Sequence, residues 1–283
     1  MHILRLANFV SPTSGGIRTA LAHWGQGYRE HGHRVSLVIP GPGPVHEEQP
    51  QGTVHRVPAL PVGRTGYSLI LHRRRLARLL EQLAPDVIEV SDRTTLRWTG
   101  AWAARHGVGS VMISHENLSG ILQRRTPLRP GPAARLADVA NRRSAAGYDA
   151  VVCPSRYAAQ EFDRLGSPAQ VVPLGVDLDM FRPSRDGGGL TPDGRPRTPG
   201  RLELVHCGRL SPEKNPGLSV ETLRELGRRG VDAHLTVLGH GPMHDTLARR
   251  ARGLPVTFHP YIPERADLAA VMARADAATA PGP

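Results

Sequence analysis

Two cations stand close together in the sequence, where a predicted strand ends and a predicted helix begins. Arg209 and Lys214 follow the apolar run 202–206, and a helical pattern starts at Pro216. A guanidinium offers phosphate a planar fork of donors and an ammonium acts as a point charge, so the pair suits a diphosphate beside a helix N-terminus. Lys214 is the single lysine among 36 basic residues. A lone lysine in a chain that otherwise uses arginine favours a position whose role requires an ammonium group and not a guanidinium. The alternative is a plain helix start with two exposed cations, capped by Asn215.

Glycine pairs follow two other predicted strands. Gly15 and Gly16 come after the run 1–7 and before a helical pattern, so their backbone amides can approach an anion at a helix N-terminus. Gly239 and Gly241 follow a later apolar run in the same way. Each pair is equally compatible with a plain turn, and neither matches the GxGxxG fingerprint of dinucleotide-binding folds.

Polar side chains follow two further strands of the first half. His115 follows the run 108–114, and Asp92 follows the run 86–90. Ligands of open α/β sheets bind outside the carboxyl ends of the strands, so His115 is a candidate to hydrogen-bond a sugar hydroxyl or to move a proton. A structural role is the alternative, since the chain has 14 histidines.

Arginines cluster on one predicted helix, residues 70–83. The cluster consists of Arg73, Arg74, Arg75 and Arg78, and leucines occupy the other face. A helix of this kind can dock on an anionic membrane surface. The alternative is a solvated face of a helix that packs on the core.

Apolar runs alternate with helical patterns along the whole chain, which predicts parallel sheets joined by right-handed crossovers. The predicted strands are residues 1–7, 35–39, 86–90, 108–114, 150–153, 170–174, 202–206, 233–238, 256–258 and 275–280. Residues 181–200 are rich in glycine and proline and predict a flexible linker. The fold class is therefore α/β, with two Rossmann-like doubly wound domains at 1–180 and 201–283. The shorter second domain is expected to be incomplete.

The composition excludes several classes of protein. Basic residues exceed acidic ones by 36 to 25, and this charge of +11 fits a compositional bias toward arginine as well as an anionic partner. Two cysteines do not make a disulfide framework, and no apolar run reaches the roughly 18 residues of a membrane span. The 4% aromatic content argues against a stacking platform for single-stranded nucleic acid, and no motif supports the nucleic-acid binder that the charge alone would allow. Zinc, hydrolase and Walker motifs are absent. We expect a cytoplasmic protein, with peripheral contact to the cytoplasmic face of a membrane through the arginine cluster.

In their order along the chain, the motifs resemble those of the retaining GT-B glycosyltransferases of family four. The matching segments cover nearly the whole chain and are Ser14-Gly15-Gly16-Ile17, Gly32-His33-Arg34-Val35, His115, Val172-Pro173-Leu174-Gly175-Val176-Asp177 with Phe181 and Pro183, Gly208-Arg209-Leu210 with Glu213-Lys214-Asn215, and Gly239-His240-Gly241-Pro242. Residues 8–16, 91–93 and 113–116 look most like those of GDP-mannose-dependent α-mannosyltransferases of cell-envelope glycolipid synthesis.

This resemblance implies transfer of a hexose from a nucleotide-sugar, mannose from GDP-mannose in the narrower match, to a lipid or glycan acceptor with retention. Arg209 and Lys214 would hold the donor diphosphate, and His115 would contact the donor sugar. The other implied contacts are the phosphate or acceptor for Gly15 and Gly16, the base for Gly239, Gly241 and Ile262, and the acceptor or membrane side for Asp92 and the arginine cluster. The resemblance implies no cofactor, no metal and no nucleic-acid partner.

One departure from the family concerns the end of the chain. The resemblance implies two glutamates seven residues apart after the last predicted strand, and the sequence ends at Pro283 before them. We therefore expect a C-terminally truncated enzyme that alone transfers little or no sugar. A non-catalytic remnant or pseudoenzyme that binds nucleotide or lipid is the alternative function. An NAD-linked oxidoreductase has less support, since GxGxxG is missing after the first strand.

Overall fold

The protein consists of two compact units, which are described separately. The computed structural model describes residues 1–10, 16–63, 67–183 and 189–281. Contacts between Cα atoms divide the chain into Met1–Gly175 and Val176–Pro283, and each unit contains its own sheet.

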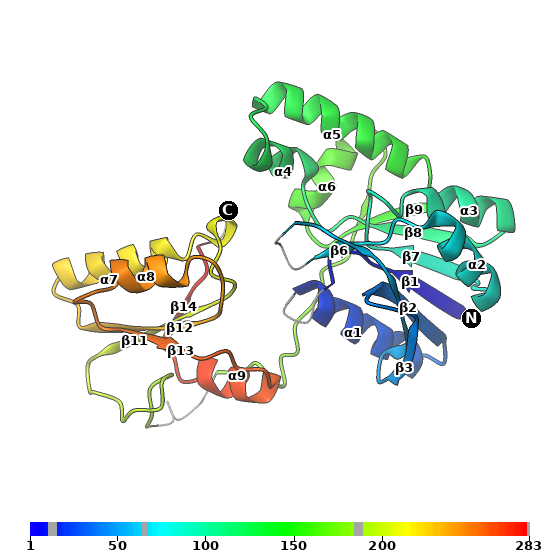
Figure 1. Ribbon diagram of the computed structural model, residues 1–283. Helices are drawn as coiled ribbons and strands as arrows, with labels where there is room; N and C mark the ends of the chain where they lie inside the picture. The colour runs from blue at the N-terminus through cyan, green and yellow to red at the C-terminus, as the bar shows by residue number, and fades with distance from the viewer. Residues whose placement is uncertain (11–15, 64–66, 184–188, 282–283) are drawn as a thin grey trace. The chain divides into compact units, whose positions relative to one another are not determined.

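The first unit is built on a sheet with the strand order β10-β9-β8-β7-β1-β2-β4-β3 (Figure 1). Its strands are β1 (His2–Leu6), β2 (Arg34–Gly41), β3 (Val45–Gln49), β4 (Gly52–Pro58), β7 (Val87–Val90), β8 (Gly109–Ile113), β9 (Ala150–Cys153) and β10 (Gln170–Val171). β3 pairs antiparallel with β4, and the other neighbours are parallel. A small separate sheet pairs β5 (Leu60–Pro61) with β6 (Ser68–Leu69). The chain order reverses at β1, which lies between β2 and β7.

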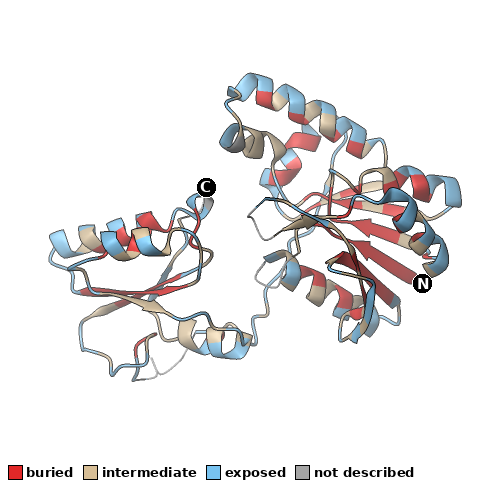
Figure 2. Ribbon diagram, viewed as in Figure 1, coloured by how far each residue is buried: buried red, intermediate tan, exposed pale blue. Residues whose placement is uncertain are grey.

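Helices cover both faces of this sheet. They are α1 (Gly16–Glu30), α2 (Arg73–Leu83), α3 (Trp98–His106), α4 (Leu118–Arg125), α5 (Pro130–Ala145) and α6 (Arg156–Asp163). On one face, an apolar core joins the strands to α2, α3 and α6 through Leu80, Trp102 and Phe162. On the other face, Leu21 of α1 packs against Leu37. Figure 2 shows the central strands β1, β2 and β7 mostly buried and the outer sides of the helices exposed.

The second unit contains a parallel sheet with the order β13-β12-β11-β14. Its elements are β11 (Leu202–Cys207), the 3-10 helix η1 (Pro212–Lys214), α7 (Gly217–Arg228), β12 (Ala233–Leu238), α8 (His244–Arg250), β13 (Val256–His259), α9 (Arg265–Met272) and β14 (Ala277–Thr279). Leu204 and Leu235 of the sheet pack with Leu223 of α7 and Leu247 of α8.

The opposite face of the second sheet is polar, and part of the expected linker covers it. His234 lies 3.0 Å from Glu203, and both are buried. Asp193 forms an ion pair of 2.8 Å with Nη2 of Arg195, and the same nitrogen lies 3.0 Å from Nε2 of His234. The sequence predicts a flexible linker over residues 181–200. In the structure, the described end of this range folds onto the second unit, because its polar side chains find partners on the sheet.

The α/β fold class and its parallel sheets are confirmed, and every predicted strand has a counterpart. The sequence does not predict the hairpin of β3 and β4 or helices α3 to α5. β3 is a charged edge strand with little alternation, and α5 begins with a Pro-Gly-Pro segment typical of turns. Within the described residues, no helix has both the length and the apolar character needed to cross a bilayer.

Candidate functional site

The predicted donor residues of the second unit gather at one edge of its sheet. Arg209 and Lys214 lie between β11 and α7, Gly239 and Gly241 lie between β12 and α8, and Ile262 follows β13. Because these strands are parallel, their carboxyl ends meet at the same edge. The structure thus brings together residues that the sequence proposes from three separate segments.

Backbone hydrogen bonds join the first two of these connections. The amide of Gly208 donates to the carbonyl of Leu238 at 3.0 Å, and the amide of Leu210 donates to the carbonyl of His240 at 3.1 Å. Both residues flank Arg209. The backbone that carries this arginine is therefore held by the loop after β12.

Two glycines make this close approach of the loops possible. A Cβ atom on Gly239 would lie 1.9 Å from the carbonyl oxygen of Gly208, and Gly239 has a φ of +155°. A Cβ atom on Gly241 would lie 2.4 Å from the carbonyl oxygen of Leu210. Backbone atoms cannot yield as a flexible side chain does, so both positions require glycine. The described geometry gives these glycines a packing role, and their contact with a base remains a prediction.

The two cations occupy different environments within their loop. Arg209 is half-buried, whereas Lys214 is exposed at the end of η1. The sequence predicts Asn215 as the N-cap of α7, and this prediction is wrong. Asn215 has a left-handed φ of +43° and ends η1, while Pro216 holds the cap position of α7. Asparagine tolerates this conformation better than most residues, so it turns the chain between the two helices.

The first unit places its candidate residues at the carboxyl edge around the central strand. Gly15 lies outside the described residues. Gly16 is the first residue of α1 and is exposed, and a Cβ atom there would meet nothing within 4 Å. Ser91 and Asp92 follow β7, and His115 follows the neighbouring strand β8.

Asp92 uses its carboxylate within its own loop. One oxygen accepts hydrogen bonds from the amide and the hydroxyl of Thr94, at 3.1 and 2.6 Å. The other oxygen accepts from the amide of Leu96 at 2.8 Å and from Asn8 at 3.1 Å. Asp92 is buried, so these bonds hold the loop in shape. Its contact with an acceptor remains a prediction.

His115 is held by two contacts and is uncharged near neutral pH. Its Nε2 lies 3.0 Å from the hydroxyl of Ser91, and its ring stacks on Trp24 with centroids 6.1 Å apart and planes at 15°. Burial lowers the pKa of His115 to about 4, and the nearby cations Arg93 and Arg5 act in the same direction. Glu89 opposes this shift without cancelling it. A neutral imidazole can accept or donate a hydrogen bond.

The helix that follows His115 is anchored by a buried carboxylate. Glu161 accepts hydrogen bonds of 2.7 Å from the amides of Leu118 and Ser119, at the N-terminus of α4. Arg93 lies 3.9 Å from Glu161 and donates a hydrogen bond of 2.9 Å to Asn141. This network fixes the connection from His115 into α4. The favourable charge of a carboxylate at a helix N-terminus adds to the effect.

Two family models match the chain. The model for Glycosyltransferase Family 4 matches residues 14–180, and the model for Glycosyl transferases group 1 matches residues 201–282. A GDP-mannose-dependent alpha-(1-6)-phosphatidylinositol dimannoside mannosyltransferase of Mycobacterium tuberculosis is 43% identical over 285 residues, covering 100% of this chain and 74% of that protein. The chain belongs to glycosyltransferase family 4.

Further relatives agree with this assignment. A GDP-mannose-dependent alpha-mannosyltransferase of Mycolicibacterium smegmatis is 28% identical over 257 residues, covering 85% of this chain and 64% of that protein. Sucrose-phosphate synthase from Thermosynechococcus elongatus matches with a TM-score of 0.70 at 17% identity, over 99% of this chain and 75% of that chain. HepE of Anabaena, in complex with UDP and glucose, matches with a TM-score of 0.69 at 18% identity, over 98% and 73%. The structural likenesses show that this glycosyltransferase has the GT-B fold.

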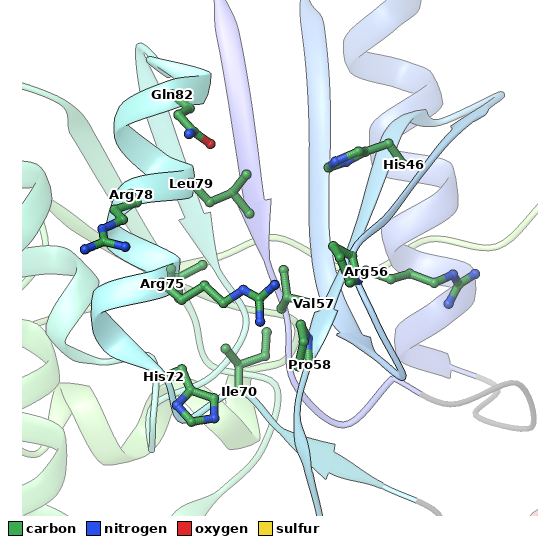
Figure 3. A pocket seen from close by; sticks show the side chains of 12 residues that line it. His46, Arg56, Val57, Pro58, Ile70, His72, Arg75, Arg78, Leu79 and Gln82 are labelled. Carbon is green, nitrogen blue, oxygen red and sulfur yellow. The ribbon is translucent and has the colours of Figure 1, made fainter.

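The arginine cluster of this glycosyltransferase family member borders an apolar pocket. Arg73, Arg74, Arg75 and Arg78 are exposed on α2. The pocket has a volume of about 280 Å³ and lies between α2 and the strands β3 and β4. Its apolar lining residues are Pro44, Val57, Pro58, Ile70, Leu76 and Leu79. Figure 3 shows Arg75 reaching across this pocket toward Val57 and Pro58.

Sequence reasoning missed the residues that hold His115. No sequence motif singles out Trp24, although its ring stacks with the imidazole. Arg5 and Glu89 lie within predicted apolar strands, and they form a buried ion pair of 2.9 Å. The available sequence signal for this ion pair is a basic residue inside one apolar run and an acidic residue inside another. It predicts a pairing only once the two strands are known to be neighbours.

We predict that Gly239→Ala destabilises the second unit, because the new Cβ atom would overlap the carbonyl oxygen of Gly208. The expected loss is about 2 kcal/mol or more in free energy of unfolding, measured by urea denaturation. Gly227→Ala in α7 is the matched control, since a Cβ atom there meets nothing within 4 Å. It should be neutral or stabilise by about 0.5 kcal/mol. Equal stability of the two variants would contradict the packing role of Gly239.

We predict that His115 makes the protein less stable in acid. Its pKa of about 4 lies below the ordinary value of 6.5, so the unfolded chain binds the proton first. Its contribution is complete above pH 6.5 and is lost as the pH falls toward 4. The difference in free energy of unfolding between wild type and His115→Asn should therefore shrink by up to about 3 kcal/mol over this window. A difference that stays constant with pH, measured in urea, would show that the imidazole is not shielded.

Proposed function

We propose that this glycosyltransferase moves a mannosyl residue from GDP-mannose to a phosphatidylinositol mannoside, with retention of configuration. The observation that carries the proposal is the 43% identity, over 100% of this chain, to the GDP-mannose-dependent mannosyltransferase of phosphatidylinositol dimannoside. The more distant relative that matches 85% of the chain is also GDP-mannose-dependent. Both named donors are the same nucleotide-sugar, which supports the donor more strongly than the acceptor.

The donor diphosphate binds at the loop between β11 and α7 in this proposal. Arg209 engages the diphosphate through its planar guanidinium, and Lys214 through its ammonium. As the bond between the anomeric carbon and the phosphate oxygen breaks, negative charge grows on the leaving GDP. Fixed cations stabilise that charge more than the ground state, by about 3 kcal/mol for each group. The bonds that hold Gly208 and Leu210 support this role, because they fix the backbone on both sides of Arg209.

The two cations supply the counter-charge for the leaving group in place of a metal ion. Among the described residues, no cluster of three histidine, cysteine, aspartate or glutamate side chains is arranged to hold a metal. The acceptor hydroxyl attacks the oxocarbenium-like sugar from the face that GDP leaves, so the new bond keeps the configuration of the old one. The proton of the acceptor passes to the departing phosphate oxygen, which balances the reaction.

His115 contacts the donor sugar as a neutral group. Its Nε2 is engaged by Ser91 at 3.0 Å, which leaves Nδ1 for a hydroxyl of the mannose. A pKa of about 4 keeps this ring uncharged at physiological pH. His115 therefore orients the sugar without adding a cation beside a developing oxocarbenium ion.

Because the proposed acceptor is a membrane lipid, the first unit has to bind the membrane surface. Four exposed arginines on α2 present positive charge to anionic headgroups, each with about 1 kcal/mol of attraction. The apolar pocket beside Arg75 and Arg78 accepts part of the lipid below the charged surface. The proposal therefore includes a peripheral position at the cytoplasmic face of the membrane, which the exposed arginines of α2 support.

We predict that Lys214→Ala weakens binding of GDP about 10-fold to 100-fold, because it removes a charge-assisted contact to the diphosphate. Isothermal titration calorimetry on the purified chain measures the affinity. Arg228→Ala is the control, since this arginine is exposed on the surface of α7. GDP-mannose should bind at least about tenfold more tightly than UDP-glucose. Unchanged GDP affinity in Lys214→Ala, or a preference for UDP-glucose, would sink the proposed donor site.

We predict that replacing Arg74, Arg75 and Arg78 by glutamine reduces binding to anionic vesicles about 100-fold, as three headgroup attractions are lost. Co-sedimentation with vesicles containing phosphatidylinositol measures this, with neutral phosphatidylcholine vesicles for comparison. The control replaces three exposed arginines of α5, which are Arg135, Arg142 and Arg143, and so removes the same charge. Equal losses in the two triple variants would mean that net charge, and not α2, directs the protein to the surface.

A further inference from the structure

A charged pair is buried beneath the carboxyl edge of the first sheet. Arg5 of β1 is 0% exposed, and its Nε donates to Glu89 of β7 at 2.9 Å. Its Nη1 donates to the carbonyl of Leu21 in α1. The second oxygen of Glu89 accepts a hydrogen bond of 2.8 Å from the hydroxyl of Tyr28. Charge, hydrogen bonds and helix packing thus fix the Arg5 guanidinium between the sheet and α1.

Two aromatic rings of α1 lie against this guanidinium. The central carbon of the group is 5.5 Å from the ring centre of Trp24 and 5.7 Å from that of Tyr28. A cation over an aromatic face is attracted by the ring, and more strongly where water is excluded. The orientation of the Trp24 ring is therefore set by a buried charge.

Stability alone gives no reason for such a pair. Two charges pay a large desolvation penalty in a protein interior, and apolar residues of similar size are often as stable there. Leu21 and Leu37 show that the same face of the sheet packs apolar residues against α1. Arg5 and Glu89 therefore provide a fixed geometry that aliphatic side chains would not provide.

Trp24 connects the buried Arg5–Glu89 pair to His115, because its ring contacts Arg5 and stacks with the imidazole. The two rings stack at 6.1 Å with an angle of 15°, and Nε2 of the imidazole is 3.0 Å from Ser91. The stacking with Trp24 sets the plane of the imidazole. The hydrogen bond with Ser91 sets the rotation of the ring within that plane. Among the described residues, Nδ1 of His115 has no hydrogen-bond partner, so this nitrogen is the one available to a ligand.

We propose that Trp24 is a positioning residue for the donor sugar: the buried Arg5–Glu89 pair fixes its ring, and the ring in turn holds His115 with Nδ1 open to a sugar hydroxyl. This inference rests on the sugar contact proposed for His115. In this inference Trp24 acts without contacting the sugar or the diphosphate. Its effect on the reaction passes through the orientation and the protonation of the imidazole.

The protonation of His115 follows from the same arrangement. The ionisable groups that act on it are Arg5 of β1, Glu89 of β7 and Arg93 in the following loop. Burial is the largest effect, and it disfavours the charged ring more than Glu89 favours it. The indole of Trp24 is stacked near the imidazole, with the ring centroids 6.1 Å apart and the planes at 15°. Removing the indole admits water and raises the pKa of His115.

Nuclear magnetic resonance of the full chain, with isotope-labelled histidine and tryptophan, tests the inference without any nucleotide. In wild type we expect contacts between ring protons of Trp24 and His115, one imidazole tautomer, and a titration midpoint near 4. Trp24→Leu should raise the midpoint by about one pH unit or more and populate both tautomers. Trp24→Phe should give an intermediate midpoint. Trp98→Leu is the matched control, since this half-buried tryptophan lies 6.0 Å from Arg73 and has no histidine contact in the described structure.

An unchanged midpoint and tautomer in Trp24→Leu would overturn the inference, as would the same shift in Trp98→Leu. If Trp24→Leu does not fold, the inference is tested by the titration midpoint of Trp24→Phe and by the contacts between ring protons in the wild type. An unchanged midpoint in Trp24→Phe together with missing ring contacts would then overturn it. In the wild type, GDP-mannose should shift the His115 signals and GDP should not, and Trp24→Leu should lose this distinction while its GDP affinity stays the same. Failure of the proposed function is seen separately, as absence of GDP-mannose binding in calorimetry. The nucleotide-free measurements decide the role of Trp24 in either case.

Discussion

Parallel pairing of the strands is the constraint on which the rest of the structure depends. It converts the order of residues in the chain into their position in space, since every residue that directly follows a strand arrives at one edge. In the second unit this gathers Arg209, Gly239 and Ile262. In the first unit it brings Ser91 beside His115. The connections carry the candidate site residues, while the strands contribute the apolar cores together with buried pairs such as Arg5–Glu89 and Glu203–His234.

Carboxylates and cations have different tasks in this molecule. Asp92 binds donors of its own loop, Glu161 binds the amides at the start of α4, and Glu89 binds Arg5 and Tyr28. Each of these acids is buried; Asp92 and Glu161 shape connections at the edge of the first sheet, and Glu89 joins β7 to β1 and α1. Arg209 and Lys214 of the second unit are more accessible. This division suits an enzyme whose leaving group is an anion, because a free carboxylate beside that group would oppose its departure.

The sequence predicts the strands and the cation loop well because both depend on local pattern. Apolar runs bounded by glycine and polar residues locate the strands, and a strand followed by Arg209 and Lys214 locates the loop at its carboxyl end. The β3 strand escapes prediction because it is a charged edge strand without apolar alternation, and α5 escapes because it begins with Pro-Gly-Pro and its Asn141 bonds residues distant in the sequence. The contact of Trp24 with His115 joins α1 to the connection after β8, and no local pattern contains it. Asn215 is not the N-cap of α7 because it ends the short 3-10 helix η1 in a left-handed conformation.

The contact between Gly239 and Gly208 bears on how this family can diversify. A side chain at position 239 would displace the backbone of Gly208 and, with it, the neighbouring Arg209. A change of donor specificity in this chain therefore has to leave this junction intact. The segment after β13 is under no such restriction, because Ile262 is only half-buried and lies in a connection of its own. Under the proposed donor site, the residues that meet the base can therefore be exchanged without moving the backbone that carries Arg209.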